Sequence, residues 1–236
     1  MREEILANVQ EEPWFLGSED DVMLSLGVSR PTLRQALRVL EQEQLVIVRR
    51  GIGGGLFARR PNNEGVAHMA SIVLRAQGTT YRDLNQALRL LTTTCARLAA
   101  ENPDAEKRKC LISYYDDRVT RVPLSQMEHQ EVIDLIGGFF VEMAHLALSP
   151  PLSLFLSVLT ELSRLPSSDV SLDADRTAET VSRHISIAHA IADGDADRAE
   201  RLLTEHFGLL LAWSDQTNPH NELLRRTPYL SSQSRR

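Results

Sequence analysis

The sequence predicts a mainly α-helical protein with an N-terminal winged helix-turn-helix and a C-terminal all-α bundle. The first observation is a tight turn at Gly27 that precedes an amphipathic segment from about residue 30 to 42. The second is a short β-branched segment with a glycine-rich turn behind it, which is typical of a β-hairpin. The third is the helical spacing of apolar residues beyond residue 76, where no strand-rich segment interrupts the pattern.

The composition is that of an ordinary globular protein. The chain has 236 residues, which suffices for two modest domains, with 42% hydrophobic and 25% charged residues. No apolar run approaches the roughly 18 residues of a membrane span, and residues 1–4 do not open a signal peptide. Cys95 and Cys110 form neither a CxxC motif nor a disulfide framework. We therefore expect a cytoplasmic protein with no membrane association.

The elements of the first domain follow from local signals. Residues 2–10 form a short amphipathic support helix, and Ser18 and Asp21 have the spacing of a capping box that opens a second helix. That helix ends at Gly27, because glycine tolerates the positive φ of a short turn. Ser29 is the expected N-cap of the next helix.

The helix over 30–42 has two different stripes. Its expected buried stripe consists of Leu33, Ala36, Leu37 and Leu40. Its second stripe is cationic, with Arg30, Arg34 and Arg38 four residues apart. Residues 45–50, the turn at 51–55 and the return at 56–58 complete a hairpin, or wing. A helix with one apolar face and one row of guanidinium groups suits the DNA major groove.

The charge distribution also favours nucleic acid. The net charge of the chain is −6, but residues 29–60 contain seven arginines and two acidic residues, a local charge of +5. The first 28 residues contain one arginine and seven acidic residues, a local charge of −6. A basic face in an acidic chain limits non-specific binding to DNA. The alternative is a merely solvated charged face.

These motifs resemble the DNA-binding domain of GntR-type bacterial repressors. The resemblance covers 16–19, 26–37 and the Arg50–Gly53 wing, over roughly the first sixty residues. It implies contacts with double-stranded DNA from Arg30, Thr32 and Arg34 and, at the wing, from Arg50 and Gly51. We expect further contacts from Ser29, Arg38, Arg49 and Gly53. Many relatives carry arginine directly after the Ser-Glu pair, where this chain has Asp20. A carboxylate repels phosphate but accepts a hydrogen bond from cytosine, so the usual operator of the family is not carried over.

The expected domains are a winged helix-turn-helix over 1–60, a linker over 61–75, a helical effector-binding and dimerisation domain over 76–215, and a polar tail over 216–236. We expect the tail to be poorly ordered without a partner. Within the bundle, helices are predicted over 81–101, after Asn102-Pro103 with proline at the first helical position, and over 124–147, 152–164, 174–192 and 196–214.

Three histidines lie on apolar faces of three predicted helices. His129 shares a face with Val132, Ile136 and Phe139. His184 aligns with Val181 and Ile191, and His206 aligns with Leu203 and Leu210. Their imidazoles would converge on one divalent ion, since zinc, nickel and related metals favour such ligands. The alternatives are three packed histidines without metal, or a metal-free effector pocket that uses them as hydrogen-bond donors.

The segment from His184 through Gly194-Asp195 to His206 resembles the FCD ligand-binding domain of the FadR subfamily. In that family an aspartate and a histidine one turn apart complete the metal site. Here His129 matches the histidine and Ser125 replaces the aspartate, which removes one negative charge. The resemblance implies a small organic effector, such as a carboxylate, at Arg89, Ser125, His129, His184 and His206.

Together the motifs predict a transcriptional regulator, and a repressor in particular, rather than an enzyme. We expect a homodimer on a palindromic operator, because two recognition helices about one DNA turn apart gain affinity and selectivity. Two other functions stay open from the sequence: a metalloenzyme with a three-histidine site, and an effector-binding protein that has lost DNA binding.

Overall fold

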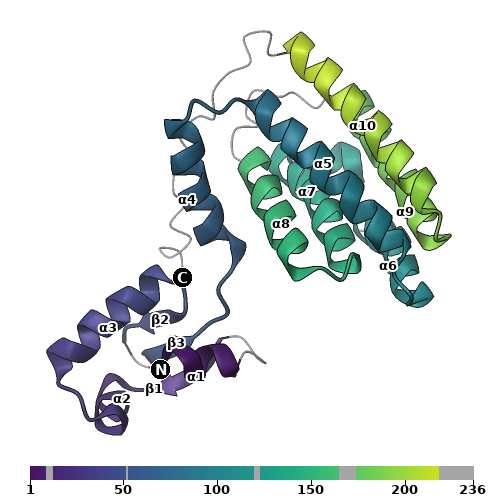
Figure 1. Cartoon of the computed structure of the whole chain (residues 1–236). Helices are drawn as coiled ribbons and strands as arrows, with labels where there is room; N and C mark the ends of the chain where they lie inside the picture. Colours follow the sequence, from purple (N-terminus) through teal and green to yellow (C-terminus); the bar gives the residue numbers. More distant parts are fainter. Residues whose placement is uncertain (9–12, 52, 120–122, 165–173, 218–236) are drawn as a thin grey trace. The chain divides into compact units, whose positions relative to one another are not determined.

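The computed structural model describes residues 1–8, 13–51, 53–119, 123–164 and 174–217 (Figure 1). The contacts within the chain separate two units, Met1–Val66 and Ala67–Arg236, and each is described by itself. The described residues are mainly helical with one small antiparallel sheet, which confirms the predicted fold class. Among these residues no helix is both long and apolar enough to cross a bilayer.

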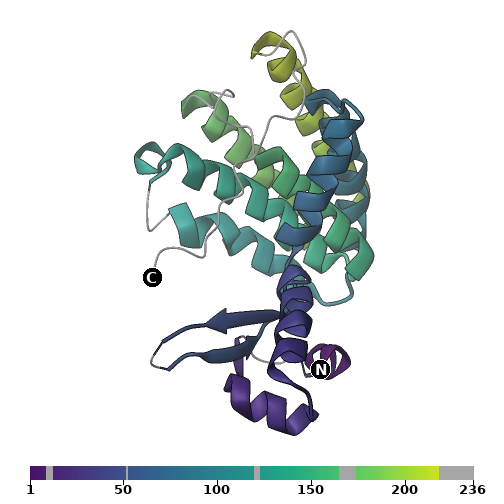
Figure 2. The same ribbon diagram turned by 90° about the vertical axis from the view of Figure 1, so that its left-hand side faces the viewer.

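The first unit combines three helices and a three-stranded sheet. Its elements are α1 (Arg2–Ala7), β1 (Trp14–Gly17), α2 (Glu19–Leu26), α3 (Arg30–Gln42), β2 (Val46–Arg49) and β3 (Gly55–Ala58). The sheet order is β1-β3-β2, with β3 antiparallel to both neighbours. Figure 2 shows β2 and β3 as the hairpin of the wing. β1 was not predicted, because its four residues form a strand only through pairing with residues 56–58, far along the chain.

Local signals set the helix boundaries of this unit. The Ser18 hydroxyl accepts from the Asp21 amide at 3.2 Å, and the Asp21 carboxylate accepts from the Ser18 amide at 3.1 Å. This capping box opens α2 as predicted, and Gly27 closes it with φ +62°. Ser29 precedes α3 as expected, but its hydroxyl bonds the Thr32 hydroxyl at 2.8 Å instead of a helix amide.

The core of the first unit confirms most of the predicted apolar stripe. Leu33, Leu37 and Leu40 are buried with Ile5 and other residues of α1, α2 and the sheet. Ala36 is exposed, contrary to the prediction. The three leucines follow one another at spacings of four and three residues and therefore lie on one side of α3. The buried face of the helix is too narrow to include the fourth residue of the predicted stripe.

The second unit is a helical bundle (Figure 1). Its elements are most of α4 (Asn63–Ala76), which begins before the boundary at Ala67, α5 (Tyr81–Ala100), α6 (Ala105–Val119), the 3₁₀ helix η1 (Leu124–Gln126), α7 (His129–Leu146), α8 (Pro150–Arg164), α9 (Ala174–Ala192) and α10 (Ala196–Thr217). α5 packs against α7, α8, α9 and α10. At the far end of α10, Trp213 lies near Arg176 of α9, with the guanidinium carbon 5.4 Å from the ring centroid.

Two helix starts differ from the prediction. The segment expected as one helix over 124–147 is η1 followed by α7, because residue 128 is extended and its amide donates to the Glu131 carboxylate at 2.8 Å. α6 begins at Ala105, so Pro103 is not its first residue. The Asn102 side chain accepts from the Asp104 amide at 2.9 Å and donates to the Leu146 carbonyl at 2.8 Å, which holds residues 102–104 outside the helix.

Three other segments also differ. Most of the expected linker over 61–75 is helical as α4, since Ala67 packs in a small core with Leu84 and Leu162. Pro150 and Pro151 belong to the first turn of α8, where the missing amide hydrogens cost no helical bond. The first predicted helix, over 2–10, is described over 2–7. Of the predicted tail, residues 218–236 lie outside the described part of the chain.

Candidate functional site

The residues predicted to contact DNA form an exposed surface of the first unit. All nine are exposed, namely Ser29, Arg30, Thr32, Arg34, Arg38, Arg49, Arg50, Gly51 and Gly53. The first five come from α3 or its N-cap, and the other four from the end of β2 and the turn of the wing. This is the arrangement in which a recognition helix and a wing reach DNA together.

Two arginines of α3 form ion pairs with acidic residues of α2. The Arg34 Nε donates to Glu19 Oε1 at 2.8 Å, and the Arg34 Nη2 donates to Glu19 Oε2 at 3.4 Å. Hydrogen bonding from Arg34 lowers the pKa of Glu19, which is therefore ionised at neutral pH. Arg30 pairs with the Asp20 carboxylate. The cationic stripe of α3 is thus partly neutralised by its own domain.

The base of the wing is an aromatic cluster. The Arg49 guanidinium lies 4.3 Å from the centroid of the Phe57 ring, and the rings of Phe57 and Phe15 are 5.2 Å apart. Gly55 has φ +153°, and a Cβ at that position would lie 2.5 Å from Phe15 Cε2. A glycine is therefore required at the start of β3, and the stacking holds Arg49 at the edge of the sheet.

Two of the three predicted metal ligands meet in the bundle. His184 comes from α9 and His206 from α10, and both side chains are buried, as predicted. Their Nε2 atoms are 3.2 Å apart. The Nδ1 atom of His184 forms a hydrogen bond with the hydroxyl of Tyr115, a buried residue of α6. The three side chains thus form a continuous polar chain inside a largely apolar core.

Burial keeps these three hydrogen-bonded side chains uncharged. It lowers the pKa of His184 well below its ordinary value and that of His206 to about 4, and it raises the pKa of Tyr115. Both imidazoles are therefore neutral at pH 7. In that state one Nε2–H donates to the other Nε2 when no ion separates them.

Aromatic rings enclose the histidine pair. Phe139 stacks on His184 with a centroid separation of 4.4 Å and an interplanar angle of 15°. Phe140 meets the same imidazole edge-on at 4.9 Å and lies 6.2 Å from His206. The stacking fixes the plane of His184, and the Tyr115 bond fixes its rotation within that plane.

The donor set fits a divalent transition metal in part. Nitrogen ligands at about 2.0–2.1 Å from a tetrahedral zinc ion lie roughly 3.3–3.4 Å apart, close to the observed separation of the two Nε2 atoms. Ligation through Nε2 would leave the Nδ1–H of His184 to donate to the Tyr115 oxygen, as ligating histidines usually donate to an outer partner. His129 is the first residue of α7 and Ser125 lies in η1, but their side chains are outside the described part of the structure.

Arg89 is the remaining predicted site residue of the bundle. Arg89 is on the exposed side of α5, so its contact with an effector stays a prediction. Among the side chains that the structure describes, no three His, Cys, Asp or Glu residues form a metal-binding group. The metal site as a whole therefore stays a prediction.

Sequence reasoning missed two residues near the pair. Tyr115 is 69 residues from His184, so no spacing rule could connect them. Thr180 lies one helical turn before His184, and its Oγ1 is buried with no hydrogen-bond partner in the described structure. A buried hydroxyl without a partner is unfavourable unless a ligand or water completes it. The spacing of four residues between Thr180 and His184 was the available signal.

Comparison with known families decides what these two units are. Residues 2–55 match the model described as bacterial regulatory proteins of the gntR family, and residues 83–209, more than half of the chain, match the FCD domain. This chain is a GntR-family transcription regulator. Its first unit is the DNA-binding domain and its second contains the FCD effector-binding domain. Family and fold indicate a regulator rather than an enzyme.

One solved structure, that of Streptococcus agalactiae GntR, supports the fold of this GntR regulator. Streptococcus agalactiae GntR is 19% identical, with a TM-score of 0.64 over 89% of this chain and 94% of that chain. Escherichia coli McbR/YncC is 14% identical, with a TM-score of 0.45 over 91% and 92% of the two chains. A GntR-family member from Pseudomonas syringae is 18% identical, with a TM-score of 0.45 over 91% and 81%. A search of curated proteins finds no match.

Proposed function

We propose that this GntR regulator is a cytoplasmic repressor of the FadR subfamily that binds a palindromic operator as a homodimer. The observation that carries the DNA contacts is the exposure of all nine predicted residues on α3 and the wing. A single recognition helix covers one half-site, so two copies related by a twofold axis would match the two halves of a palindrome.

The proposed effector is a small organic carboxylate that binds in the bundle beside His184 and His206. The support is the polar chain itself, because two neutral imidazoles with facing Nε2 atoms are unusual in a core lined by Phe139 and Phe140. The unpartnered Thr180 hydroxyl, one turn away, is a suitable donor to a carboxylate oxygen.

His184 and His206, together with His129, would hold the divalent metal that the FCD resemblance implies. When bound, the ion supplies positive charge and an open position for an anionic group. Tyr115 would orient His184, and the loss of the aspartate charge at Ser125 would weaken the affinity relative to a site with a carboxylate ligand.

Regulation requires that the effector bind two arrangements of the dimer unequally. An effector with equal affinity for the DNA-bound and the free arrangements would leave operator occupancy unchanged. We therefore propose that occupation of the bundle changes the spacing of the two recognition helices.

The DNA contacts are tested with Arg34→Ala in the full-length protein. We expect a loss of about 1–3 kcal/mol of operator affinity, measured by fluorescence anisotropy with an operator duplex at several salt concentrations. Arg198→Ala removes an exposed arginine of α10 and is the control that should leave the affinity unchanged. Equal affinity of Arg34→Ala and wild type would refute the assignment of α3 as the recognition helix.

The metal is tested by calorimetric titration of chelator-treated protein with ZnCl₂ and NiCl₂. Wild type should bind about one ion per chain, and His206→Asn should bind at least about tenfold more weakly, because one of the ligands is lost. His189→Asn changes an exposed histidine of α9 and is the matched control. Identical isotherms for His206→Asn and wild type would exclude the buried pair as a metal site.

A further inference from the structure

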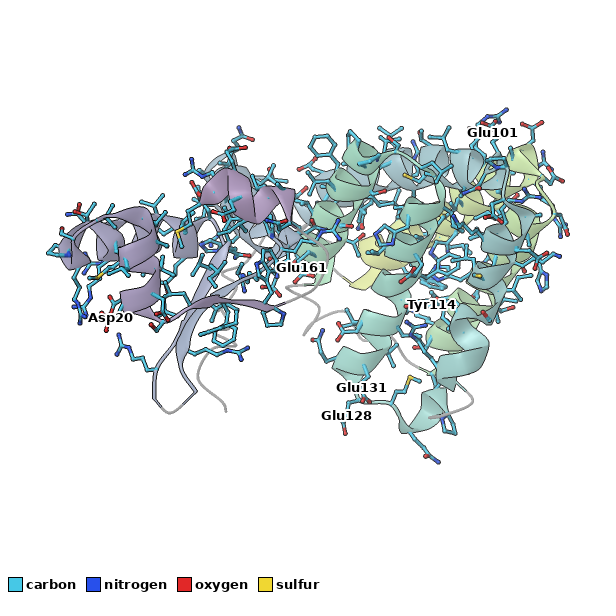
Figure 3. All side chains as sticks on the ribbon, turned by 90° about the horizontal axis from the view of Figure 1, so that it is seen from below. Asp20, Glu101, Tyr114, Glu128, Glu131 and Glu161 are labelled. Carbon is cyan, nitrogen blue, oxygen red and sulfur yellow. The ribbon has the colours of Figure 1, made fainter. Side chains whose placement is uncertain are left out.

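Asp20 and Arg30 present opposite hydrogen-bonding groups side by side at the surface of the DNA-binding unit. Asp20 is the second residue of α2 and Arg30 is the first residue of α3. Their side chains form an ion pair while staying 74% and 49% exposed. Figure 3 shows Asp20 at the surface of the first unit. Each group therefore keeps unused hydrogen-bonding capacity that faces solvent.

We propose that Asp20 is a specificity-determining residue, which together with Arg30 selects one G·C base pair in each half-site. The inference rests on the proposed docking of α3 in the major groove. In that groove guanine offers two acceptors, N7 and O6, and cytosine offers the N4 amino donor. An arginine supplies donors for the guanine, and a carboxylate beside it accepts from the cytosine, so the pair matches the edge of one G·C base pair.

The second ion pair of this surface differs in a way that supports this assignment. Glu19 is only 31% exposed and holds Arg34 through two nitrogens, so its carboxylate is largely engaged within the domain. Asp20 is more than twice as exposed as Glu19. Glu19 is thus suited to positioning Arg34, whereas Asp20 is available to a base.

Asp20 also acts against binding to DNA of the wrong sequence. A carboxylate near the phosphates is repelled by them, and an arginine that is already paired displaces fewer counterions than a free one. Where the base pair is not G·C, two acceptors for Arg30 and an amino donor for Asp20 are not presented side by side, so at least one of the two groups is desolvated without its full set of hydrogen bonds. The pair therefore lowers non-specific affinity more than specific affinity.

The experiment uses the full-length protein with Asp20→Asn, and with Glu41→Gln as the matched control. Glu41 is an exposed acidic residue in the last part of α3, so its change removes the same charge from the same domain. Preferred half-sites are selected from a pool of random duplexes for each protein. Affinities for the selected duplex, a duplex with the G·C pair replaced, and a scrambled duplex are then measured between 50 and 200 mM KCl.

Wild type should select a fixed G·C pair in each half-site and discriminate against its replacement by about tenfold or more. Asp20→Asn should lower that discrimination by about threefold, because Arg30 still reads the guanine, and it should bind scrambled DNA more tightly and show a salt slope steeper by about one unit. Glu41→Gln should keep the wild-type preference. Asp20→Glu, which retains the carboxylate, should keep at least part of it.

Two results would overturn the inference. One is an unchanged selected half-site and an unchanged ratio of specific to scrambled affinity in Asp20→Asn. The other is an equal gain of affinity for every duplex, which would make Asp20 a general electrostatic brake without base preference. A wild-type protein that selects no half-site at all would instead refute the proposed DNA contacts, and this inference with them.

Discussion

The DNA-binding unit and the bundle use polar side chains in opposite ways. In the first unit, Arg30 and Arg34 are charged, exposed and paired with acidic residues at the surface. In the bundle, His184, His206 and Tyr115 are uncharged, buried and enclosed by aromatic rings. Surface charges contribute little to folding and remain available to a partner, whereas a buried polar chain is tied to the packing of the whole core.

The largest effect is expected when the packing around the buried histidines is disrupted. Phe139→Ala removes the ring stacked on His184 at a fully buried position, and we expect it to lower the free energy of unfolding by about 3–5 kcal/mol. Urea unfolding followed by far-ultraviolet circular dichroism measures this change. Phe155→Ala alters an exposed phenylalanine of α8 and is the control. A small effect of Phe139→Ala would mean that the histidine pair does not depend on its aromatic enclosure.

A smaller effect is expected from acidification of metal-free protein. The pKa of His206 is about 4 in the folded chain and about 6.5 in the unfolded chain, so the unfolded chain binds its proton first. The stabilising contribution of the neutral His206 is therefore fully present above pH 6.5, and it is lost as the pH decreases from 6.5 towards 4. His206 alone should contribute a loss of about 2 kcal/mol between pH 7 and pH 5.

This pH dependence is checked by urea unfolding at both pH values in the presence of a chelator. His206→Gln should remove its share of about 2 kcal/mol and leave the loss that His184 contributes, because burial lowers the pKa of His184 as well. His189→Gln, at an exposed position of α9, should keep the full pH dependence. If the free energy of unfolding of His206→Gln fell as much as that of wild type between pH 7 and pH 5, other titratable groups would be responsible. The buried histidine would then not set the bundle apart from the DNA-binding unit.

The capping box of α2 should have an effect of about 1 kcal/mol. Ser18→Ala removes the side-chain bond to the Asp21 amide, and α2 amides should exchange their hydrogens about fivefold to tenfold faster. Ser29→Ala is a closely matched comparison, because Ser29 occupies the same position before α3 without a bond to a helix amide. Equal effects of the two changes would show that the capping bond is not the stabilising element.

The smallest effect is expected for a surface network of the bundle. Arg97 contacts Glu101, Asp197 and Glu200, and all four side chains are exposed. Because water and salt screen such pairs, Arg97→Ala should leave the thermal midpoint unchanged within error. A clear decrease of the thermal midpoint would show that exposed ion pairs also stabilise this protein, contrary to the contrast drawn above.

The first unit could be predicted well because its signals are local. The Ser18 capping box, the turn at Gly27 and the spacing of Leu33, Leu37 and Leu40 each lie within a few residues of the structure that they determine. β1 was missed because its hydrogen bonds go to β3, about forty residues later. In the α7 region, apolar spacing predicted the helix but not its first residue, which depends on the cap at Glu128.

The candidate site in the bundle could be predicted only in part. The apolar surroundings of His184 and His206 follow from helical spacing, and their burial is confirmed. Their hydrogen bond to each other and the bond to Tyr115 depend on how α6, α9 and α10 pack, which no single helix encodes. The position of Arg89 on the exposed side of α5 has the same origin, because periodicity alone does not fix the rotation of a helix by one residue.

The distribution of the two tryptophans makes the chain its own fluorescent reporter. Trp14 lies in β1 of the DNA-binding unit, and Trp213 lies in α10 near Arg176. The chain has no other tryptophan. Trp14→Phe and Trp213→Phe therefore give single-tryptophan proteins in which the emission of one ring follows one unit. An effector added to the protein that retains only Trp14 would reveal, without any added dye, whether an event in the bundle reaches the domain that holds DNA.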